Sequence, residues 1–209
     1  MRQAGAAADQ PAQAEYRVLV AGSQTGADRA ALRAARSSGI HTMGIAPQGF
    51  KTETGPEPSL ADEFGLQDSA GRGGYAAADQ ANVQLSDALL AFRYRVPKTG
   101  RGCEKTVHFA RVGTYTHVPL EWPPPDTVTQ LLPADGSHPA GVPVLVVWDL
   151  AADNLHAAHA AAAAFLRGMH RPMVSGPCES TNPEAAGLIE TLLTAVFTSW
   201  QAESRVAIV

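Results

Sequence analysis

Short apolar runs alternate along the chain with longer segments in which apolar residues recur every three or four positions. The clearest run is Val144–Trp148, and a β-branched run at Tyr16–Ala21 leads directly into Gly22. Apolar runs of four to eight residues are typical of strands buried on both faces of a parallel sheet. The pattern predicts strands at 16–21, 41–46, 88–92, 144–148 and 172–175.

The periodic segments predict helices. Ala and Leu are spaced by three and four from Ala27 to Ser37, and Gly39 suits the position that ends a helix. Further helices are predicted at 75–83, 103–112, 154–167 and 183–200. The alternation of strand and helix indicates an α/β fold, a Rossmann-like three-layer domain with a mostly parallel sheet of about five strands.

The 209 residues suit one domain. We expect a single ligand-binding domain at 16–200, a disordered tail at 1–15 where Ala, Gln, Gly and Pro predominate, and a second tail at 201–209. Residues 121–143 are rich in Pro, Asp, Gly and Ser and lack periodicity. This segment is interpreted as an insertion, because structureless loops of such length are uncommon in compact domains.

Composition narrows the class of protein. The chain is 45% hydrophobic but only 6% aromatic, so alanine together with Val, Leu and Ile must build the core. The net charge of −4 argues against a broad basic surface for nucleic acid. No apolar run approaches the roughly 20 residues that span a bilayer, and the N-terminus does not have the pattern of a signal peptide. Cys103 and Cys178 form no disulfide framework. We therefore expect a cytoplasmic protein that binds neither nucleic acid nor membranes.

Three predicted strands pass through a glycine turn into a helix, at Gly22–Gly26, Gly100–Gly102 and Gly176–Pro177. In an open parallel sheet, ligands bind outside the carboxyl ends of the strands. Helix N-termini there present free N–H groups that suit phosphate, and a Cβ would keep the backbone from closing on the anion. Our hypothesis is that the three loops form one pocket for a phosphate-bearing ligand. The first loop is neither G-x-G-x-x-G nor G-x-x-x-x-G-K-[ST], which disfavours a standard dinucleotide fold or P-loop NTPase.

Each polar residue in these loops also has a structural interpretation. Thr25 and Asp28 have the spacing of a capping-box relative, in which Thr25 caps the helix and Asp28 answers its dipole. Alternatively, Asp28 contacts a donor-rich part of the ligand, such as a pterin amino group or a ribose hydroxyl. Asp87 has the same two interpretations, as a turn residue or a ligand contact.

No catalytic or metal-binding residue is predicted. His156 and His159 are three apart on one predicted helix, but no third ligand of the right type accompanies them. The chain contains no Cys-x-x-Cys, His-Glu-x-x-His or Gly-x-Ser-x-Gly motif. Cys178 precedes a helix, where a thiolate is stabilised, although a small residue filling its position is the preferred interpretation.

The segment Ala21–Leu32 closely resembles the opening motif of the molybdenum-cofactor carrier proteins, which belong to the SLOG superfamily of Rossmann-like ligand binders. Further similar segments keep their order along the chain, at Pro47–Lys51, Tyr75, Ser86–Leu90 and Val174–Ser180. The resemblance spans about residues 18–193. It implies molybdenum cofactor (molybdopterin) as a bound ligand, held for storage, protection or transfer. It also implies a homo-oligomer, with molybdoenzyme apo-proteins as partners.

Three departures from the family pattern affect the ligand more than the fold. Ser23 replaces a usual glycine, Arg101 and Cys103 break a Gly-Gly-Thr turn, and Cys178 stands where an arginine is expected. Loss of that arginine removes a bidentate phosphate donor, and compensation by Arg101, Lys98 or Lys105 is a hypothesis. The predicted cofactor-binding residues are Gly22, Ser23, Gln24, Thr25, Gly26, Asp28, Arg29, Thr99, Gly100, Arg101, Gly102, Thr106, Gly176, Pro177, Glu179 and Ser180.

Two other functions stay open. One is a sensor or binding module for a nucleotide or an ADP-ribose-like ligand, since pterin and nucleotide both offer a phosphate and a flat ring. The other is a phosphoribohydrolase related to cytokinin-activating enzymes, because Thr99–Glu104 loosely resembles their motif. Glu104 would then be a catalytic carboxylate, although a first-turn acid that answers the helix dipole is the preferred interpretation.

Overall fold

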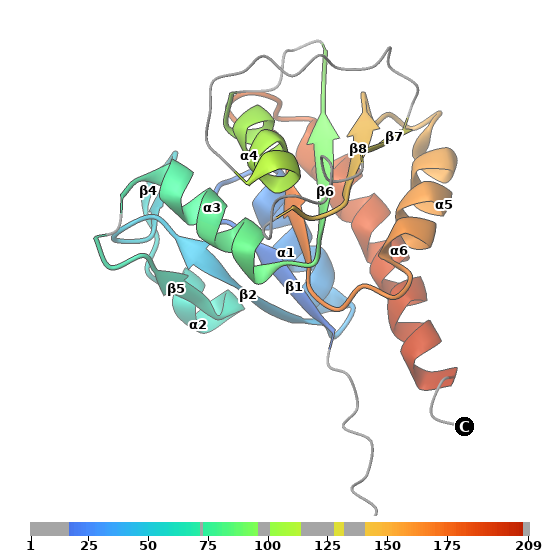
Figure 1. Ribbon diagram of the computed structural model, residues 1–209, viewed down its shortest axis with the longest axis horizontal. Coiled ribbons are helices and arrows are strands. Elements are labelled where there is room, and N and C mark those ends of the chain that lie inside the picture. Colours follow the sequence, from blue (N-terminus) through green and yellow to red (C-terminus); the bar gives the residue numbers. More distant parts are fainter. Residues whose placement is uncertain (1–16, 72, 96–100, 114–127, 132–140, 207–209) are drawn as a thin grey trace, which may run out of the picture.

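The computed structural model describes residues 17–71, 73–95, 101–113, 128–131 and 141–206. The tail predicted at 1–15 lies outside these residues. One seven-stranded sheet forms the centre of the molecule, in the order β5-β2-β1-β9-β6-β8-β7 (Figure 1). The strands of this sheet are β1 (Val18–Ala21), β2 (His41–Ala46), β5 (Leu66–Asp68), β6 (Ala88–Arg93), β7 (Val128–Leu131), β8 (Val144–Trp148) and β9 (Pro172–Ser175).

The sheet is mostly parallel, as predicted. All strand pairs are parallel except β7 with β8, which are antiparallel. The last strand of the chain, β9, lies at the centre of the sheet between β1 and β6. Segments from the two ends of the sequence therefore meet at the carboxyl ends of β1 and β9.

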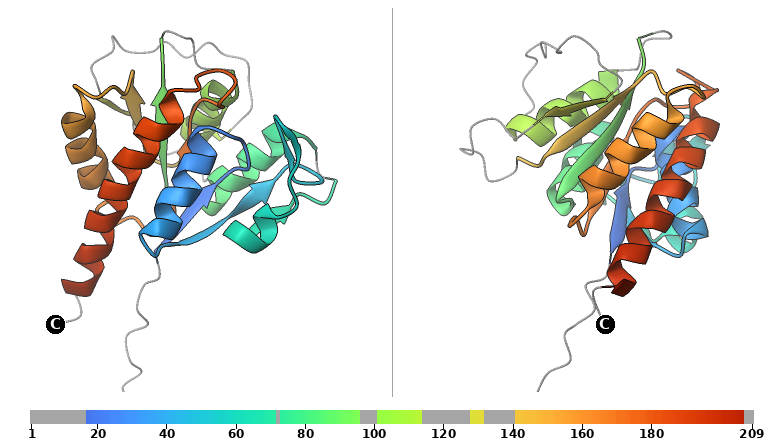
Figure 2. Two further views of the ribbon diagram at one scale, coloured as in Figure 1. Left: turned by 180° about the vertical axis from the view of Figure 1, so that it is seen from behind. Right: turned by 90° about the vertical axis from the view of Figure 1, so that its right-hand side faces the viewer.

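Helices cover both faces of the sheet and make the predicted three layers (Figures 1 and 2). The helices α3 (Tyr75–Leu85) and α4 (Arg101–Val112) pack together on one face. The other face carries α1 (Ala27–Ser37), α5 (Leu155–Leu166) and α6 (Ala185–Val206). A short helix, α2 (Leu60–Phe64), packs beside β5 at the edge of the sheet.

Alanine builds one side of the core, as the composition predicts. The buried face of α1 carries alanines that are at most 1% exposed: Ala27, Ala30, Ala31, Ala34 and Ala35. These side chains join the large residues of α6, among them Phe197 and Trp200, in one apolar cluster. Small side chains on one helix leave room for the large ones on its neighbour, which keeps the interior close-packed.

The predicted strands and helices are present with small shifts at their ends. The sheet has seven strands instead of the predicted five or so, and the two additional strands are β5 and β7. No pattern in the sequence predicts the hairpin of β3 (Lys51–Thr52) and β4 (Gly55–Pro56) either. These strands have two to four residues and no run of buried positions. β7 lies within the segment predicted as an insertion, and α6 extends to Val206, into the predicted C-terminal tail.

Asn82 connects α3 to the end of β2. It is fully buried, its side-chain nitrogen donates to the carbonyl oxygen of Ile45 at 3.0 Å, and its side-chain oxygen accepts the Ile45 N–H at 2.6 Å. We expect Asn82→Ala to lower the free energy of unfolding by about 1–2 kcal/mol, since both backbone groups lose their partner. Denaturant unfolding would measure this loss. The exposed Gln84 on the same helix provides the control, because Gln84→Ala should change stability by less than about 0.5 kcal/mol.

Candidate functional site

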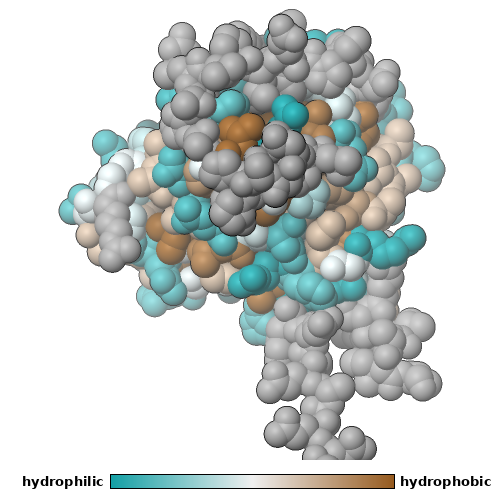
Figure 3. All heavy atoms as spheres, viewed as in Figure 1, coloured by the Kyte–Doolittle hydropathy of each residue, from teal (hydrophilic) through white to brown (hydrophobic). Residues whose placement is uncertain are grey.

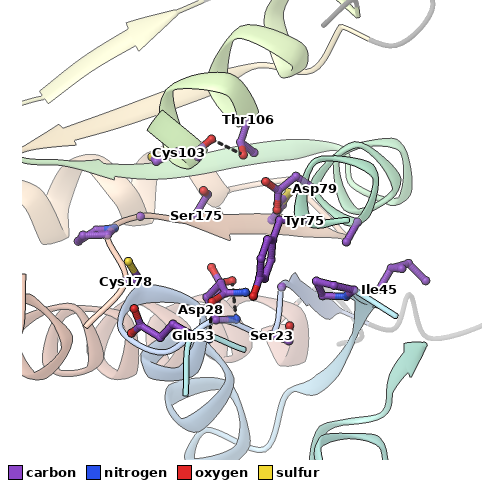
Figure 4. A pocket seen from close by; sticks show the side chains of 18 residues that line it. Ser23, Asp28, Ile45, Glu53, Tyr75, Asp79, Cys103, Thr106, Ser175 and Cys178 are labelled. Carbon is purple, nitrogen blue, oxygen red and sulfur yellow. Dashed lines mark hydrogen bonds between the residues drawn. The ribbon is translucent and has the colours of Figure 1, made fainter. Parts of the chain in front are cut away.

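A cavity of about 320 Å³ lies at the carboxyl ends of β1, β2 and β9, below α3 and the start of α4 (Figure 4). We call it the strand-end cavity. From the neighbouring strands β9 and β6, the chain continues to helices on opposite faces of the sheet, α6 and α4. Such a topological switch point is where open α/β sheets bind ligands. The cavity therefore lies where the sequence places the site.

The structure brings half of the predicted binding residues together in this cavity. They are Gly22, Ser23, Gln24, Asp28, Gly102, Thr106, Gly176 and Pro177. Other predicted residues lie beside the cavity without lining it, namely Thr25, Gly26, Arg29, Glu179 and Ser180. Thr99, Gly100 and the side chain of Arg101 lie outside the described part of the chain.

The first glycine loop closes on a carboxylate of the protein itself. A Cβ on Gly22 would lie 2.4 Å from Oδ2 of Asp28, and the N–H of Gln24 donates to the same oxygen at 3.2 Å. The glycine thus makes room for Asp28. The prediction that Thr25 caps the helix is wrong: Gly26 holds the N-cap position, and no side chain bonds there.

Glu53, in the turn between β3 and β4, occupies the donors of the first and third loops. Its carboxylate accepts hydrogen bonds from the hydroxyls of Thr25 and Ser180, and from the N–H of Ser180 at 3.2 Å. Its own N–H donates to Oε1 of Gln24 at 3.1 Å. Burial would raise the pKa of Glu53, but hydrogen bonds led by those from Ser180 lower it below its ordinary value. A bound phosphate would compete with this ionised carboxylate.

The predicted Arg29 and Glu179 also have protein partners. The guanidinium of Arg29 forms an ion pair with Glu57 at 2.9 Å, and the N–H of Glu179 donates to the hydroxyl of Thr25 at 3.3 Å. The carboxyl of Glu57 has a lowered pKa, because the bonds from Arg29 and from Thr52 outweigh the effect of its burial. These residues therefore support the loops.

The second glycine loop differs from the other two in the space around its glycine, Gly102. A Cβ on Gly102 would meet no described atom within 4 Å, whereas a Cβ on Gly26 would lie 2.4 Å from the Pro177 carbonyl oxygen. Gly176 is similarly closed, by Ala27 at 2.6 Å. Since α4 begins at Arg101, its first turn has room for an anion beside the cavity.

Two carboxyl groups face the cavity from opposite sides. Asp28 comes from α1 and Asp79 from α3, and both are half-buried (Figure 4). Burial raises the pKa of Asp28 to about 7, with a further increase from the charge of Asp79. Burial also raises the pKa of Asp79 to about 7, against the opposing effects of Thr106 and Lys105. The pair resists holding two negative charges near neutral pH.

The structure adds lining residues that were not predicted as binding residues. They are Ile45, Pro47, Glu53, Tyr75, Ala78, Asp79, Cys103, Met173, Ser175 and Cys178. The resemblance includes Pro47, Tyr75 and Cys178 without assigning them to the pocket. Asp79 follows Tyr75 by four residues in a predicted helix, so the helical spacing alone puts both on one face.

Both cysteines line the cavity. The thiol of Cys103 contacts the Phe92 carbonyl oxygen at 3.6 Å, and burial raises its pKa to about 11. The sulfur of Cys178 lies 2.9 Å from the hydroxyl of Thr181. The thiol of Cys103 is therefore protonated at neutral pH, and its buried side chain forms part of the cavity wall.

Other candidates from the sequence lie outside the cavity. Asp87 is a structural turn residue, whose carboxylate accepts the N–H groups of His170 at 2.6 Å and Arg171 at 3.0 Å. Glu104, the carboxylate that a phosphoribohydrolase would require, is not among the lining residues. Within the described ranges, no three His, Cys, Asp or Glu side chains are grouped to hold a metal ion.

The fold and the cavity define a Rossmann-like α/β protein with a cavity at the carboxyl ends of its strands. The chain belongs to the circularly permutated YpsA SLOG family, whose sequence profile matches residues 19–131. The chain also resembles a solved structure from Syntrophus aciditrophicus described as a "putative molybdenum carrier protein". The two share 23% identity over 87% of this chain and 95% of the other, with a TM-score of 0.61. This likeness confirms the fold.

A comparison with curated proteins found no match. Among the helices that the structure describes, none combines the length and the apolar character needed to cross a membrane.

Proposed function

We propose that the chain binds molybdenum cofactor in the strand-end cavity and holds it for storage, protection or transfer to molybdoenzyme apo-proteins. The cavity itself carries this proposal. Its volume of about 320 Å³ lies at the lower end of the range for ligand pockets, roughly 300–1,000 Å³, so it can enclose the ring system of the ligand. It combines hydrogen-bonding carboxyls with an aromatic wall and an open helix start. Family membership and the described carrier that shares the fold support the same ligand class.

The ligand phosphate belongs at the start of α4. Protein carboxylates occupy donors of the first and third loops through Asp28 and Glu53. Gly102, by contrast, lies at the positive end of the α4 dipole, and none of the described atoms is within 4 Å of its Cβ position. This assignment replaces a cradle of three loops with one phosphate site and leaves the cavity interior for the ring.

Gly102→Asp tests the phosphate site. The new carboxylate would project into open space, so folding should be unaffected, but it would repel a phosphate at the helix start. We expect affinity for phosphate-bearing ligands to fall by about tenfold or more. Gly187→Asp is the matched control, because Gly187 lies in α6 with nothing within 4 Å. Unchanged affinity in Gly102→Asp would remove α4 from the site.

Titration calorimetry separates the candidate ligands. The protein would be titrated under anaerobic conditions with molybdenum cofactor, AMP and ADP-ribose in one buffer. The carrier function predicts that the cofactor binds at least about tenfold more tightly than either nucleotide. The reverse order would reassign the protein as a nucleotide-binding module, and the fold would be unaffected. We also expect a homo-oligomer, which the molar mass in solution would test.

A further inference from the structure

We propose that the strand-end cavity selects its ligand by the N–H-rich edge of a flat heteroaromatic ring, which Asp28 and Asp79 bind as hydrogen-bond acceptors. The inference rests on the proposed function and deepens it, because it names the ring chemistry that is recognised. The fitting class carries an amino group beside a ring N–H, as in a 2-amino-4-oxopteridine or a guanine. A ring that presents a carbonyl oxygen to these carboxyls would be rejected.

The first argument is the charge of the lining. Asp28 and Asp79 face each other across the cavity, and no Lys or Arg is among the described lining residues. A carboxylate accepts hydrogen bonds, and N–H groups that donate to it favour its ionised form over the protonated form that burial alone favours. Arg29 and Lys105 act on the two carboxyls from outside the lining. A ligand edge with adjacent N–H groups adds donors inside the cavity to those that Gln24 gives Asp28 and Thr106 gives Asp79.

The second argument is independent of the carboxyls. Ser23 lines the cavity at 1% exposure, and its hydroxyl has no hydrogen-bond partner. The side-chain nitrogen of Gln24, another lining residue, also has none. Buried polar atoms without partners are rare, and each requires an explanation. Both groups are donors, and a serine hydroxyl reorients by rotation about one bond. They match the ring carbonyl that neighbours the amino edge of such rings.

The third argument is the shape of the wall beside Asp79. Tyr75 lies one helical turn before Asp79, and its hydroxyl donates to the Thr52 carbonyl oxygen at 3.3 Å (Figure 4). Tyr75 is 39% exposed, the one exposed large hydrophobic side chain in the described part of the chain. Figure 3 shows the molecule in the view of Figure 1, in which hydrophobic and hydrophilic residues mix over the face that carries α3. With Ile45 and Met173, Tyr75 offers flat apolar surface on which a ring can stack.

Two unphosphorylated rings test the inference. Pterin carries the 2-amino group, and lumazine carries an oxo group in the same position. Titration of the full chain by ring fluorescence should give at least about tenfold tighter binding of pterin, because a site that hydrogen-bonds an N–H edge leaves its acceptors unpaired with the oxo analogue. Asp28→Asn and Asp79→Asn should each reduce this preference severalfold, since an amide can donate to the oxo group.

The matched control is Asp153→Asn, an exposed carboxyl in the turn before α5, which should leave the preference unchanged. Circular dichroism and thermal unfolding would establish that each variant folds. Equal affinity for the two rings, no binding of either at millimolar concentration, or a preference that survives both cavity variants would overturn the inference. Neither ring carries phosphate or metal. A protein that prefers pterin but fails to bind molybdenum cofactor would therefore overturn the carrier function alone.

Discussion

Gly26→Ala is expected to lower the free energy of unfolding by about 2–5 kcal/mol and to disrupt the cavity. Gly26 has φ 77° and ψ −125°, a backbone conformation that L-residues rarely adopt and that costs them at least about 1–2 kcal/mol. Its Cβ would also lie 2.4 Å from the Pro177 carbonyl oxygen and 2.8 Å from the Glu179 nitrogen. Crowding of this kind costs about 1–3 kcal/mol more. These contacts are with backbone, so relief requires the first and third loops to separate.

Comparison with Gly49→Ala separates the steric cost of Gly26→Ala from its conformational cost. Gly49 has φ 71°, close to the value at Gly26, but nothing lies within 4 Å of its Cβ position. Its substitution should lower the free energy of unfolding by about 1–2 kcal/mol, which is the conformational cost alone. Urea unfolding of both variants measures the difference. Equal losses would mean that the two loops do not meet as closely as the structure has them. Ligand affinity should fall in Gly26→Ala and stay unchanged in Gly49→Ala.

The fold could be predicted from the sequence because its long elements are strongly patterned. Val144–Trp148 is buried at every position, and the small residues of α1 recur on one face. The hairpin of β3 and β4 and the edge strand β5 have two or three residues each, too few for a pattern to develop. Their positions depend on tertiary contacts, such as the bonds of Glu53 to Ser180.

The sequence predicts a site at the sheet edge, where the structure has a cavity, but it does not predict the side chains that line the interior of that cavity. The glycine loops carry this prediction, since a strand followed by a glycine turn and a helix places backbone donors at the sheet edge. The expectation of a phosphate cradle at Gly22–Gly26 does not include the carboxylates of Asp28 and Glu53, which accept hydrogen bonds from Gln24 and Thr25 of this loop. Glu53 lies 28 residues from Thr25 in the sequence, and nothing local predicts that they bond. Asp79 could have been predicted from the sequence, because it lies four residues after Tyr75 on the same predicted helix and therefore on the same face.

The central position of β9 explains why segments so distant in sequence build one site. The first strand and the last strand are parallel neighbours, with Ala21 opposite Val174. The turns that follow them are therefore adjacent, and the Ala27 N–H donates to the Pro177 carbonyl oxygen at 3.0 Å. The loops pack against each other through Gly26 and Gly176, which leaves the space above them to α3 and α4. Two of the three glycine loops form the floor of the cavity, which leaves the start of α4 as the proposed phosphate site.

The double substitution Asp28→Asn with Asp79→Asn is expected to stabilise the protein at pH 8 by about 2–4 kcal/mol. Each carboxyl has a pKa raised from 3.8 to about 7 in the folded state. The folded state therefore binds more protons than the unfolded state between about pH 4 and pH 7, and stability falls as the pH rises through this window. One unit of pKa difference corresponds to about 1.4 kcal/mol. Both carboxyls are only half-buried, so solvent screening reduces the full sum of the two shifts to the expected value of about 2–4 kcal/mol. The asparagines cannot ionise, so the variant avoids this loss.

Urea unfolding at pH 4.5, 6 and 8 would measure the stability gap between the variant and the unmodified protein. The gap should be largest at pH 8 and shrink steadily as the pH falls, approaching zero only below about pH 4, where the carboxyls become protonated in the unfolded state as well. Asp153→Asn, which replaces an exposed carboxyl, should change stability little at any of these pH values. A gap that does not depend on pH, or a variant less stable at pH 8, would contradict the electrostatic account. A carboxyl pair that lowers stability at neutral pH is typical of a binding site, where function is retained at the expense of the fold. A ligand that donates hydrogen bonds to both carboxyls should recover part of the lost stability.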